Sequence, residues 1–518
     1  MKNIIQRVEV SKLRFLIFSL IIVATSCKKD GSKTESNDNG LGLNLASASE
    51  IQGTPTTPEF LVGSLPSSSI LDMPPIGNQG RQGSCVAWAT AYAGMSFFMN
   101  RSNGTHYNST QELCSPKFLY NQIKYSSDCN SGSTFPTAFK LLQSKGVCTL
   151  NDMPYSETEC SSQPNTTQNN NALNNRIFSW RVVDKNNTNV VKSCIAAKYP
   201  VFIAINIDES FKNLRSPYIW TAKYGNSSGG HAVTVVGYDD TKGAFKVQNS
   251  WGSNYQDSGH FWISYSFFSQ AVIGSECYIA FPIVTSPNDN INSGLVVNMP
   301  FNGNANDVSG NNNNGVISGV TLTSDSKGNS NSAYKFNGYS SPSSITISSS
   351  PSLNNLTAYS ICFWVKLDSH AGDNGTGNVA ADGNSQTSFQ TILYKGGNTL
   401  AQYNAGYRFL LSSQANIFGV YLGSGGGGQT SGAYSKINEW HYYVFSKSGN
   451  VLKMFKDGIL IWDLQSSFAN LSDVNGFNLM LGKSSIAGSG IPFNGVLDEF
   501  RIYNRALTQS EVQKLYKL

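Results

Sequence analysis

The chain has 518 residues, which is enough for two or three domains of ordinary size. Charged residues make up only 13% and aromatic residues 12%, and 48 glycines accompany runs of Asn and Ser, a composition typical of exported, β-rich proteins with polar loops. Of the net charge of +5, residues 1–26 supply +3, so the remaining +2 argues against a nucleic-acid partner.

Residues 1–26 have the pattern of an export signal. Four basic residues precede the apolar stretch Phe15–Val23, and three small residues then lead into Cys27. The apolar stretch is shorter than the roughly 20 residues that span a bilayer, but it fits the core of a signal peptide. The sequence Ala-Thr-Ser-Cys resembles a bacterial lipobox. We therefore expect an exported lipoprotein, anchored through lipid on Cys27 in the outer membrane or at the cell surface; the alternative is a simple signal peptide followed by an incidental cysteine.

The segment 27–57 follows the predicted lipid anchor and consists mainly of Lys, Asp, Gly, Ser, Asn and Pro. Its low apolar content predicts a flexible tether that holds a domain away from the membrane.

Residues 58–284 mix helical and strand patterns and are predicted to form an α+β domain. Gly146 is expected to end one of the helices, and the Asn-rich segment 165–175 is expected to be a surface loop. The predicted helices are 86–99, 118–124 and 138–145, and the predicted strands are 201–207, 232–236, 244–248 and 260–263.

A linker at 285–293 precedes residues 294–518, which are predicted to be all β. Short alternating runs separated by Gly, Asn and Asp indicate a sandwich or jelly roll. Asp457-Gly458 lies between two apolar runs and predicts a tight hairpin. Thr508 and Glu511 form a capping box that predicts one short helix at the end of the chain.

Nine cysteines are present. Besides Cys27 and Cys85, six lie between residues 114 and 277, and in an oxidising compartment some of them are expected to pair, although the sequence does not choose their connectivity. Cys362 lies in a strand-like run and is expected to be a buried thiol. No Cys/His cluster has the spacing of a zinc site.

Three segments carry residues suited to nucleophilic catalysis. Gln79–Ala89 places Cys85 at the start of a helix, where backbone N–H groups and the helix dipole favour a thiolate. In Ser228–Tyr238, glycines lead into His231 at the start of a strand, and in 247–252 Asn249 follows a strand. Taken singly, these residues also suit a half-cystine, a core histidine and a turn, but their order and spacing together favour a catalytic site.

These segments resemble those of papain-family cysteine peptidases. The resemblance implies that Cys85 attacks the scissile carbonyl as a thiolate, and that His231 protonates the leaving amine and then activates water. It implies that Asn249 orients the imidazole and that Trp251 shields their hydrogen bond from water. No cofactor is expected for this chemistry.

The resemblance also implies that the side-chain amide of Gln79 and the backbone N–H of Cys85 form an oxyanion hole. The chain departs from the family at three places. Gln82 replaces a cysteine, so that family disulfide cannot form; Val86 replaces a tryptophan; and a glycine pair that docks the substrate backbone is reduced to Gly132. These departures leave the chemistry intact and concern specificity.

A pro-segment of the length usual in the family is not expected, because only the polar tether precedes residue 58. The enzyme then either needs no such inhibitor or is controlled in another way.

Residues 294–518 resemble concanavalin A-like, laminin-G-like jelly rolls, most specifically at Gly495–Leu507. The resemblance implies a glycan or an extracellular protein as ligand. Some such domains hold a structural Ca²⁺, for which Asp498 and Asp307 are the predicted ligands; the alternative is that these carboxylates cap turns.

The sequence thus predicts a cysteine-type peptidase that hydrolyses peptide bonds of extracytoplasmic proteins, tethered to the membrane and directed by its jelly roll. The alternative is an adhesin or glycan-binding surface lipoprotein with a silent papain-like domain, although the intact Gln79, Cys85, His231 and Asn249 argue against it. A third reading keeps the thiol chemistry but transfers the acyl group to an amine, as a transpeptidase does.

Overall fold

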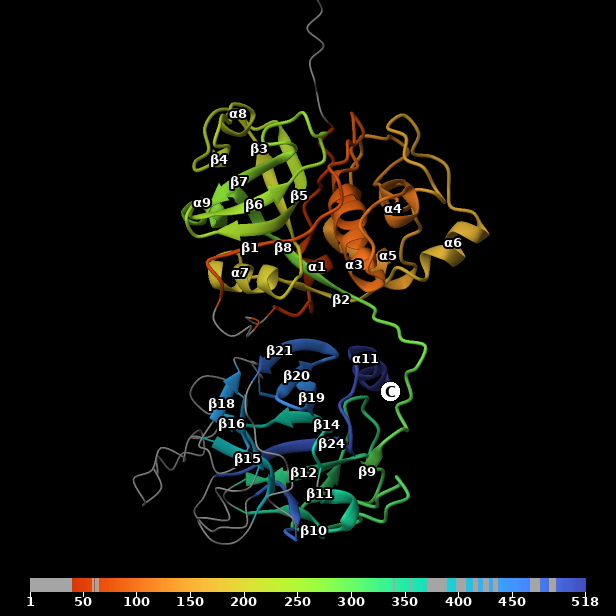
Figure 1. Cartoon of the computed structure of the whole chain (residues 1–518), viewed down its shortest axis with the longest axis vertical. Coiled ribbons are helices and arrows are strands. Elements are labelled where there is room, and N and C mark those ends of the chain that lie inside the picture. Colours follow the sequence, from red (N-terminus) through yellow and green to blue (C-terminus); the bar gives the residue numbers. More distant parts are fainter. Residues whose placement is uncertain are drawn as a thin grey trace, which may run out of the picture. The chain divides into compact units, whose positions relative to one another are not determined.

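The structure is a computed structural model of the full chain (Figure 1). It describes residues 40–57, 60, 65–338, 341–354, 356–369, 389–396, 407–412, 418–422, 428–431, 437–465, 476–483 and 491–518. The predicted signal and Cys27 lie outside these residues. Within them, no helix combines the length and apolar character needed to cross a bilayer.

A long helix begins at Cys85. It runs through α2 (Cys85–Ala87), a π-helical segment η1 (Trp88–Met95) and α3 (Ser96–Asn103), and ends where Gly104 adopts a left-handed φ of 66°. Every residue from 85 to 98 is buried, so the helix forms the centre of the helical half of this domain.

Two further helices, α4 (Pro116–Ile123) and α5 (Phe135–Ser144), pack beside this long helix (Figure 1). Each begins with a hydroxyl that accepts a backbone N–H of the first turn, from Ser115 and Thr134 respectively. The shorter helices are α1 (Ala48–Ile51), α6 (Thr166–Ala172), α7 (Thr188–Ala196), α8 (Glu209–Lys212) and α9 (Tyr265–Ala271).

The other half of the domain is a sheet in the order β2-β8-β3-β5-β6-β7-β4, with β1 paired to β5. β5 and β6 are antiparallel, with Thr234 opposite Gln248. The start of β5 and the end of β6 therefore lie at the same edge, which brings His231 and Asn249 together. The strands are β1 (Ser68–Ile70), β2 (Ile177–Val182), β3 (Val201–Ile207), β4 (Ile219–Trp220), β5 (Gly229–Asp239), β6 (Ala244–Gln248), β7 (His260–Ser264) and β8 (Val272–Pro282).

The C-terminal part consists of two largely antiparallel sheets. The first has the order β10-β13-β22-β15-β16-β17-β18, with β23 on β15, and the second has the order β11-β12-β24-β14-β19-β20-β21, with β9 on β24. Buried apolar side chains from both sheets, such as Leu393 and Phe363, form the core of a sandwich.

The strands of the first sheet are β10 (Gly315–Ser318), β13 (Ser344–Ile347), β15 (Phe389–Lys395), β16 (Tyr407–Ser412), β17 (Phe418–Leu422), β18 (Gly428–Ser431), β22 (Leu479–Leu481) and β23 (Ile491–Pro492). Those of the second are β9 (Leu295–Met299), β11 (Thr321–Thr323), β12 (Ala333–Asn337), β14 (Tyr359–Leu367), β19 (Trp440–Ser448), β20 (Val451–Lys456), β21 (Ile459–Gln465) and β24 (Asn494–Tyr503).

Most of the predicted turns and caps are present. Asp457 and Gly458 have φ values of 52° and 78° and join β20 to β21 as a hairpin. The capping box of Thr508 and Glu511 starts α11 (Gln509–Lys517), and Gly146 follows α5 with φ 78°. Cys362 is a buried free thiol.

Two local expectations were wrong. Residues 165–175 are not a simple loop, because Asn165 and Gln168 form a capping box that starts α6. Residues 40–57 are not a flexible tether, because they are hydrogen-bonded to the domain that follows.

The expectation that some of the six cysteines between residues 114 and 277 pair is confirmed by one disulfide, Cys129–Cys160, and the other four are free and buried.

Candidate active site

Cys85 lies at the first position of α2, directly after the loop Gln79–Ser84. Its thiol is fully buried, and burial raises the pKa of Cys85 to about 11. Backbone N–H groups of Ala232, Gly42 and Val86 donate towards the sulfur and partly offset this shift. The amide of Ala232 belongs to the residue after His231, so the backbone of β5 is directly beside the thiol.

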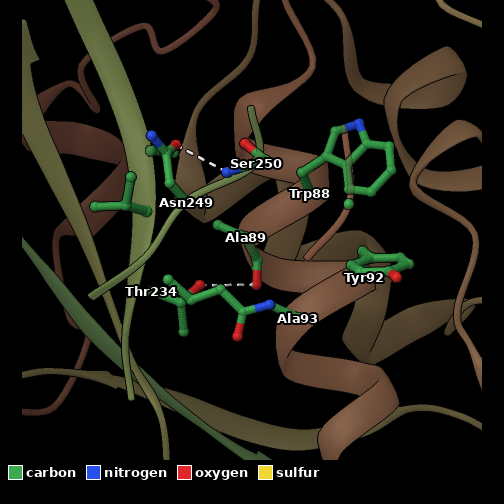
Figure 2. A pocket seen from close by; sticks show the side chains of 11 residues that line it. Trp88, Ala89, Tyr92, Ala93, Thr234, Asn249 and Ser250 are labelled. Carbon is green, nitrogen blue, oxygen red and sulfur yellow. Dashed lines mark hydrogen bonds between the residues drawn. The ribbon is translucent and has the colours of Figure 1, made fainter. Parts of the chain in front are cut away.

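His231 is also fully buried, in the third position of β5. Its Nε2 lies 2.8 Å from Oδ1 of Asn249. The same oxygen accepts the backbone N–H of Ser250 at 2.8 Å, and Figure 2 shows this second bond. Because Oδ1 only accepts, Nε2 must carry the proton in the neutral imidazole. Nδ1 is then left as the basic nitrogen, and it has no hydrogen-bond partner among the described residues.

The surroundings of the imidazole are apolar. The Trp251 ring stacks on it, with centroids 4.5 Å apart and planes 28° from parallel. Burial lowers the pKa of His231 to about 4, although the hydrogen bond to Asn249 acts in the opposite direction. Burial therefore favours the neutral forms of both Cys85 and His231.

A small pocket lies behind the site, between the long helix and the start of β5 and end of β6 (Figure 2). Its lining includes Trp88, Thr234, Gln248, Asn249 and Ser250. The hydroxyl of Thr234 donates to the carbonyl of Ala89 at 3.3 Å, which joins the sheet to the helix that carries Cys85.

The amide of Gln79 is buried and has a defined orientation. Its Oε1 accepts the hydroxyl proton of Ser250 at 2.7 Å, so Nε2 points the other way and donates to the carbonyls of Gly40 and Gln82, at 2.8 and 2.9 Å. Ser250 links this donor to Asn249, the neighbouring residue. The sequence did not single out Ser250, although its place directly after Asn249 is a signal that could have done so.

Tyr155 is a second residue that sequence reasoning missed. Its hydroxyl donates to the carbonyl of Gln79 at 2.8 Å and lies 3.1 Å from Oε1 of Gln82 and 2.9 Å from Oγ of Ser84. One hydroxyl thus holds three positions of the loop before Cys85. No sequence pattern marks Tyr155 as part of the site.

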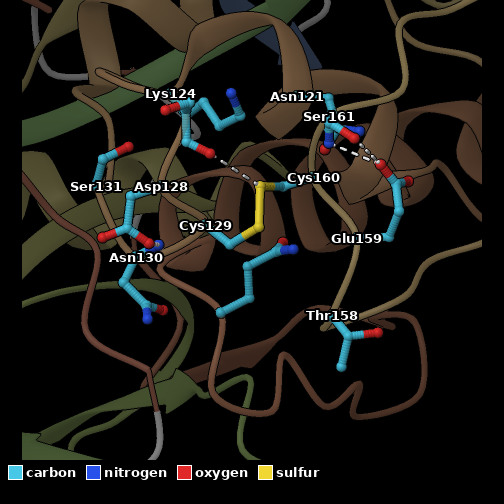
Figure 3. The surroundings of a disulfide bond; sticks show 12 residues. Asn121, Lys124, Asp128, Cys129, Asn130, Ser131, Thr158, Glu159, Cys160 and Ser161 are labelled. Carbon is cyan, nitrogen blue, oxygen red and sulfur yellow. Dashed lines mark hydrogen bonds between the residues drawn. A yellow bond between two sulfur atoms is a disulfide. The ribbon is translucent and has the colours of Figure 1, made fainter.

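The disulfide Cys129–Cys160 lies next to the same loop (Figure 3). The carbonyl of Cys129 accepts the N–H of Gly83 at 2.9 Å and the hydroxyl of Tyr120 at 2.7 Å. The disulfide therefore fixes the segment whose carbonyl holds Gly83, two residues before Cys85.

Gly132 follows three residues after this half-cystine and has a left-handed φ of 72°. It lies against residues 40–44, because a Cβ at this position would be 2.4 Å from the carbonyl oxygen of Gly42. The backbone bonds at this place are made by the next residue, Ser133, whose N–H donates to Gly42 and whose carbonyl accepts from Asn44, both at 2.9 Å.

The two predicted calcium ligands have different surroundings. Asp307 accepts backbone N–H groups from Asn298, Ser309 and Asn313, each at 2.9 Å, as expected for a carboxylate that caps a turn. Burial raises the pKa of Asp498 to about 8. The described residues contain no group of three or more His, Cys, Asp or Glu arranged to hold a metal ion, and the calcium site remains a prediction.

Comparisons with known proteins assign both parts of the chain. The papain family of cysteine proteases matches residues 68–281, and the concanavalin A-like lectin/glucanase superfamily matches residues 339–513. Gamete and mating-type specific protein A of Dictyostelium discoideum is 30% identical over 208 residues, 39% of this chain and 43% of that protein. The thiol protease SEN102 of Hemerocallis is 28% identical over 244 residues, 44% of this chain and 62% of that protein. The chain thus spans less than two thirds of either relative.

Among solved structures, xylellain, a cysteine protease from Xylella fastidiosa, is 26% identical with a TM-score of 0.41, covering 47% of this chain and 97% of that one. Domain 4 of AbnA, an extracellular arabinanase from Geobacillus stearothermophilus in complex with arabinotriose, is 20% identical with a TM-score of 0.32, covering 43% and 98%. The family matches, rather than these structures, identify residues 68–281 as a papain-family cysteine protease domain and residues 339–513 as a concanavalin A-like, laminin-G-like domain.

Proposed function

We propose that the chain is a cysteine peptidase that hydrolyses peptide bonds of extracytoplasmic proteins, with Cys85 as nucleophile and His231 as its base. One observation carries the proposal: the bond from Nε2 of His231 to Asn249 leaves Nδ1 as the basic nitrogen, and the N–H of the next residue, Ala232, is directed towards the Cys85 thiol. Asn249 acts as the orienting group and the amide of Gln79 as an oxyanion donor.

In the reaction, the proton of the Cys85 thiol moves to Nδ1 of His231 and the sulfur attacks the scissile carbonyl carbon. The carbon–nitrogen bond breaks as the imidazolium gives this proton to the leaving amine, and a thioester remains on Cys85. Water then gives a proton to Nδ1, its oxygen attacks the thioester, and the acid is released with the thiol restored.

The test is labelling of the full chain with an epoxide inhibitor of the kind that alkylates papain-like enzymes, under mild reduction, followed by peptide mass spectrometry. We expect an adduct on Cys85 that His231→Ala abolishes. The four other buried free thiols of this domain, Cys114, Cys148, Cys194 and Cys277, are internal controls and should stay unmodified. No adduct on Cys85 in a folded chain contradicts the proposal and favours the silent adhesin.

Turnover of a peptide substrate with and without an added amine separates hydrolysis from acyl transfer. A free acid as the main product supports the peptidase, whereas an amide of the added amine supports the transpeptidase.

The export and anchoring of the chain are part of the same proposal. Residues 1–26 act as a signal peptide and Cys27 carries the lipid, which places the peptidase at a membrane surface. A clickable fatty acid fed to an expressing bacterium should label the wild-type chain and not Cys27→Ser. Equal labelling of both chains contradicts the anchor.

The concanavalin A-like domain is proposed to bind a glycan or an extracellular protein and so direct the peptidase to its substrates. Its membership in a superfamily of lectins and glucanases supports a ligand of this kind. Binding of the full chain to immobilised glycans, with and without a calcium chelator, tests both the ligand and the calcium prediction.

A further inference from the structure

The side chain of Gln82 joins the loop before Cys85 to a separate segment, formed by Tyr155, Ser156 and Glu157. Gln82 is one of the positions at which the sequence departs from the papain family, and only 1% of its surface is exposed. Its Oε1 lies 3.1 Å from the hydroxyl of Tyr155, and its Nε2 donates to the carbonyls of Ser156 and Glu157, at 3.3 and 3.5 Å. The buried amide therefore finds all of its partners in this one segment.

The segment Tyr155–Glu157 also holds other residues of the loop Gln79–Ser84. Oε2 of Glu157 accepts the backbone N–H of Arg81 at 2.9 Å, and the hydroxyl of Tyr155 contacts both ends of the loop. A Cβ at Gly80 would lie 1.5 Å from Oε2 of Glu157, so the carboxylate takes this place because Gly80 has no side chain. The left-handed φ of 60° at Gly80 also favours glycine.

The backbone of Gln82 in turn orients the amide of Gln79, the predicted oxyanion donor. The carbonyl of Gln82 accepts one hydrogen of Nε2 of Gln79 at 2.9 Å, and it also accepts the N–H of Ser84 at 2.8 Å. The second hydrogen of Nε2 is directed at another carbonyl, that of Gly40, at 2.8 Å. An oxyanion would need this second hydrogen, and because the amide is planar, its direction is set once Gln82 holds the first.

Both supports of the loop are fixed to each other. Cys160, three residues after Glu157, forms the disulfide with Cys129, whose carbonyl accepts the N–H of Gly83 at 2.9 Å. The loop Gln79–Ser84 itself contains no cysteine. Hydrogen bonds alone therefore attach the loop to its supports, and the side chain of Gln82 provides the buried ones to the segment Tyr155–Glu157.

We propose that Gln82 is a positioning residue of this peptidase, which holds the amide of Gln79 in the direction that an oxyanion requires. The inference rests on the proposed function and adds a residue to its site. Gln82 acts through Gln79 and does not touch the reacting atoms. Without its anchor, the backbone of Gln82 is free to move, and the amide of Gln79 spends less time in the productive orientation. Because the negative charge on the oxygen develops in the transition state, the loss falls on kcat and not on KM.

The experiment measures kcat and KM for a peptide substrate in full chains. Gln82→Met keeps the length of the side chain and removes its polar atoms. It is compared with the wild type, with Gln79→Ala and with the double variant. Gln143→Met is the matched control, because Nε2 of Gln143 also donates to a backbone carbonyl, that of Phe178 at 2.9 Å, but joins α5 to β2 away from the loop.

We expect Gln82→Met to lower kcat roughly 5- to 20-fold, the effect of one or two net hydrogen bonds, with KM within about twofold of the wild type. Gln143→Met should have the kcat of the wild type. The double variant should be no slower than Gln79→Ala, because without the amide of Gln79 the anchor has no donor to orient. A residue that only stabilises the fold would not show this dependence on Gln79.

An unchanged kcat in Gln82→Met overturns the positioning role while the peptidase stands. So does a double variant that is slower than Gln79→Ala by the full factor that Gln82→Met shows on its own. No turnover in the folded wild type overturns the proposed function and this inference with it, so the two failures are distinguishable. If Gln82→Met does not unfold cooperatively in urea, Gln82→Asn carries the test, because it keeps a buried amide but is one methylene too short to reach Ser156 and Glu157.

Discussion

Removal of the Cys129–Cys160 disulfide should destabilise the peptidase domain by an amount that the loop length gives directly. The bond closes a loop with a sequence separation of 31 residues. In the chain-entropy treatment, a loop of this size restricts the unfolded chain by about 12 cal/mol/K, or about 3.7 kcal/mol at 25 °C. The variant Cys129→Ala/Cys160→Ala should lose about this free energy of unfolding.

The assay is urea unfolding of the full chain, followed by tryptophan fluorescence. With a urea dependence of about 2–3 kcal/mol per molar for a domain of this size, the midpoint of the transition should fall by about 1–2 M. A phosphine reductant should lower the wild-type midpoint to the same value and leave the variant unchanged, which is the matched control.

The same double substitution should loosen the loop before Cys85, because the carbonyl of Cys129 accepts the N–H of Gly83 in that loop. An unchanged midpoint in the variant, or a wild-type midpoint that does not respond to the reductant, would refute the reasoning.

Three further predictions concern catalysis. Gln79→Ala should lower kcat by about 10²–10³ with little change in KM, because an oxyanion donor acts in the transition state; a change confined to KM contradicts this role. Tyr155→Phe should lower kcat by about 10-fold with Cys85 still alkylated, because its hydroxyl positions the loop from Gln79 to Ser84; an unchanged kcat shows that the loop holds itself. Burial raises the pKa of Cys85 to about 11, so in the wild-type chain the thiolate fraction and the alkylation rate should still be rising between pH 8 and about 10, whereas a plateau near pH 7 contradicts this effect of burial.

Much of this protein could be predicted from short stretches of sequence. The hairpin at Asp457-Gly458 and the capping box at Thr508 depend on backbone conformations and hydrogen bonds within a few residues, so local sequence is sufficient. The segments around Cys85, His231 and Asn249 were recognisable for a similar reason, since each places a reactive side chain at the end of a helix or a strand.

The bonds across the site depended on segments that lie far apart in the chain. Tyr155 holds Gln79 from 76 residues away, and nothing in the sequence distinguishes it from a tyrosine on the surface. Cysteine pairing is equally non-local. Of the six cysteines between residues 114 and 277, the fold brings only Cys129 and Cys160 into a bond, and buries the other four as thiols.

Residues 40–44 show the difference most clearly. By itself the sequence of residues 27–57 indicates a polar, glycine-containing tether, because a segment with few apolar residues cannot form a core of its own. In the tertiary structure, residues 40–44 pack against the domain that follows them. Two glycines allow close contact with its backbone, and Leu43 joins its apolar core. The candidate catalytic residues could be predicted from local patterns, but their burial beneath residues 40–44 depends on contacts between residues about 40 to 190 positions apart, which only the folded chain creates.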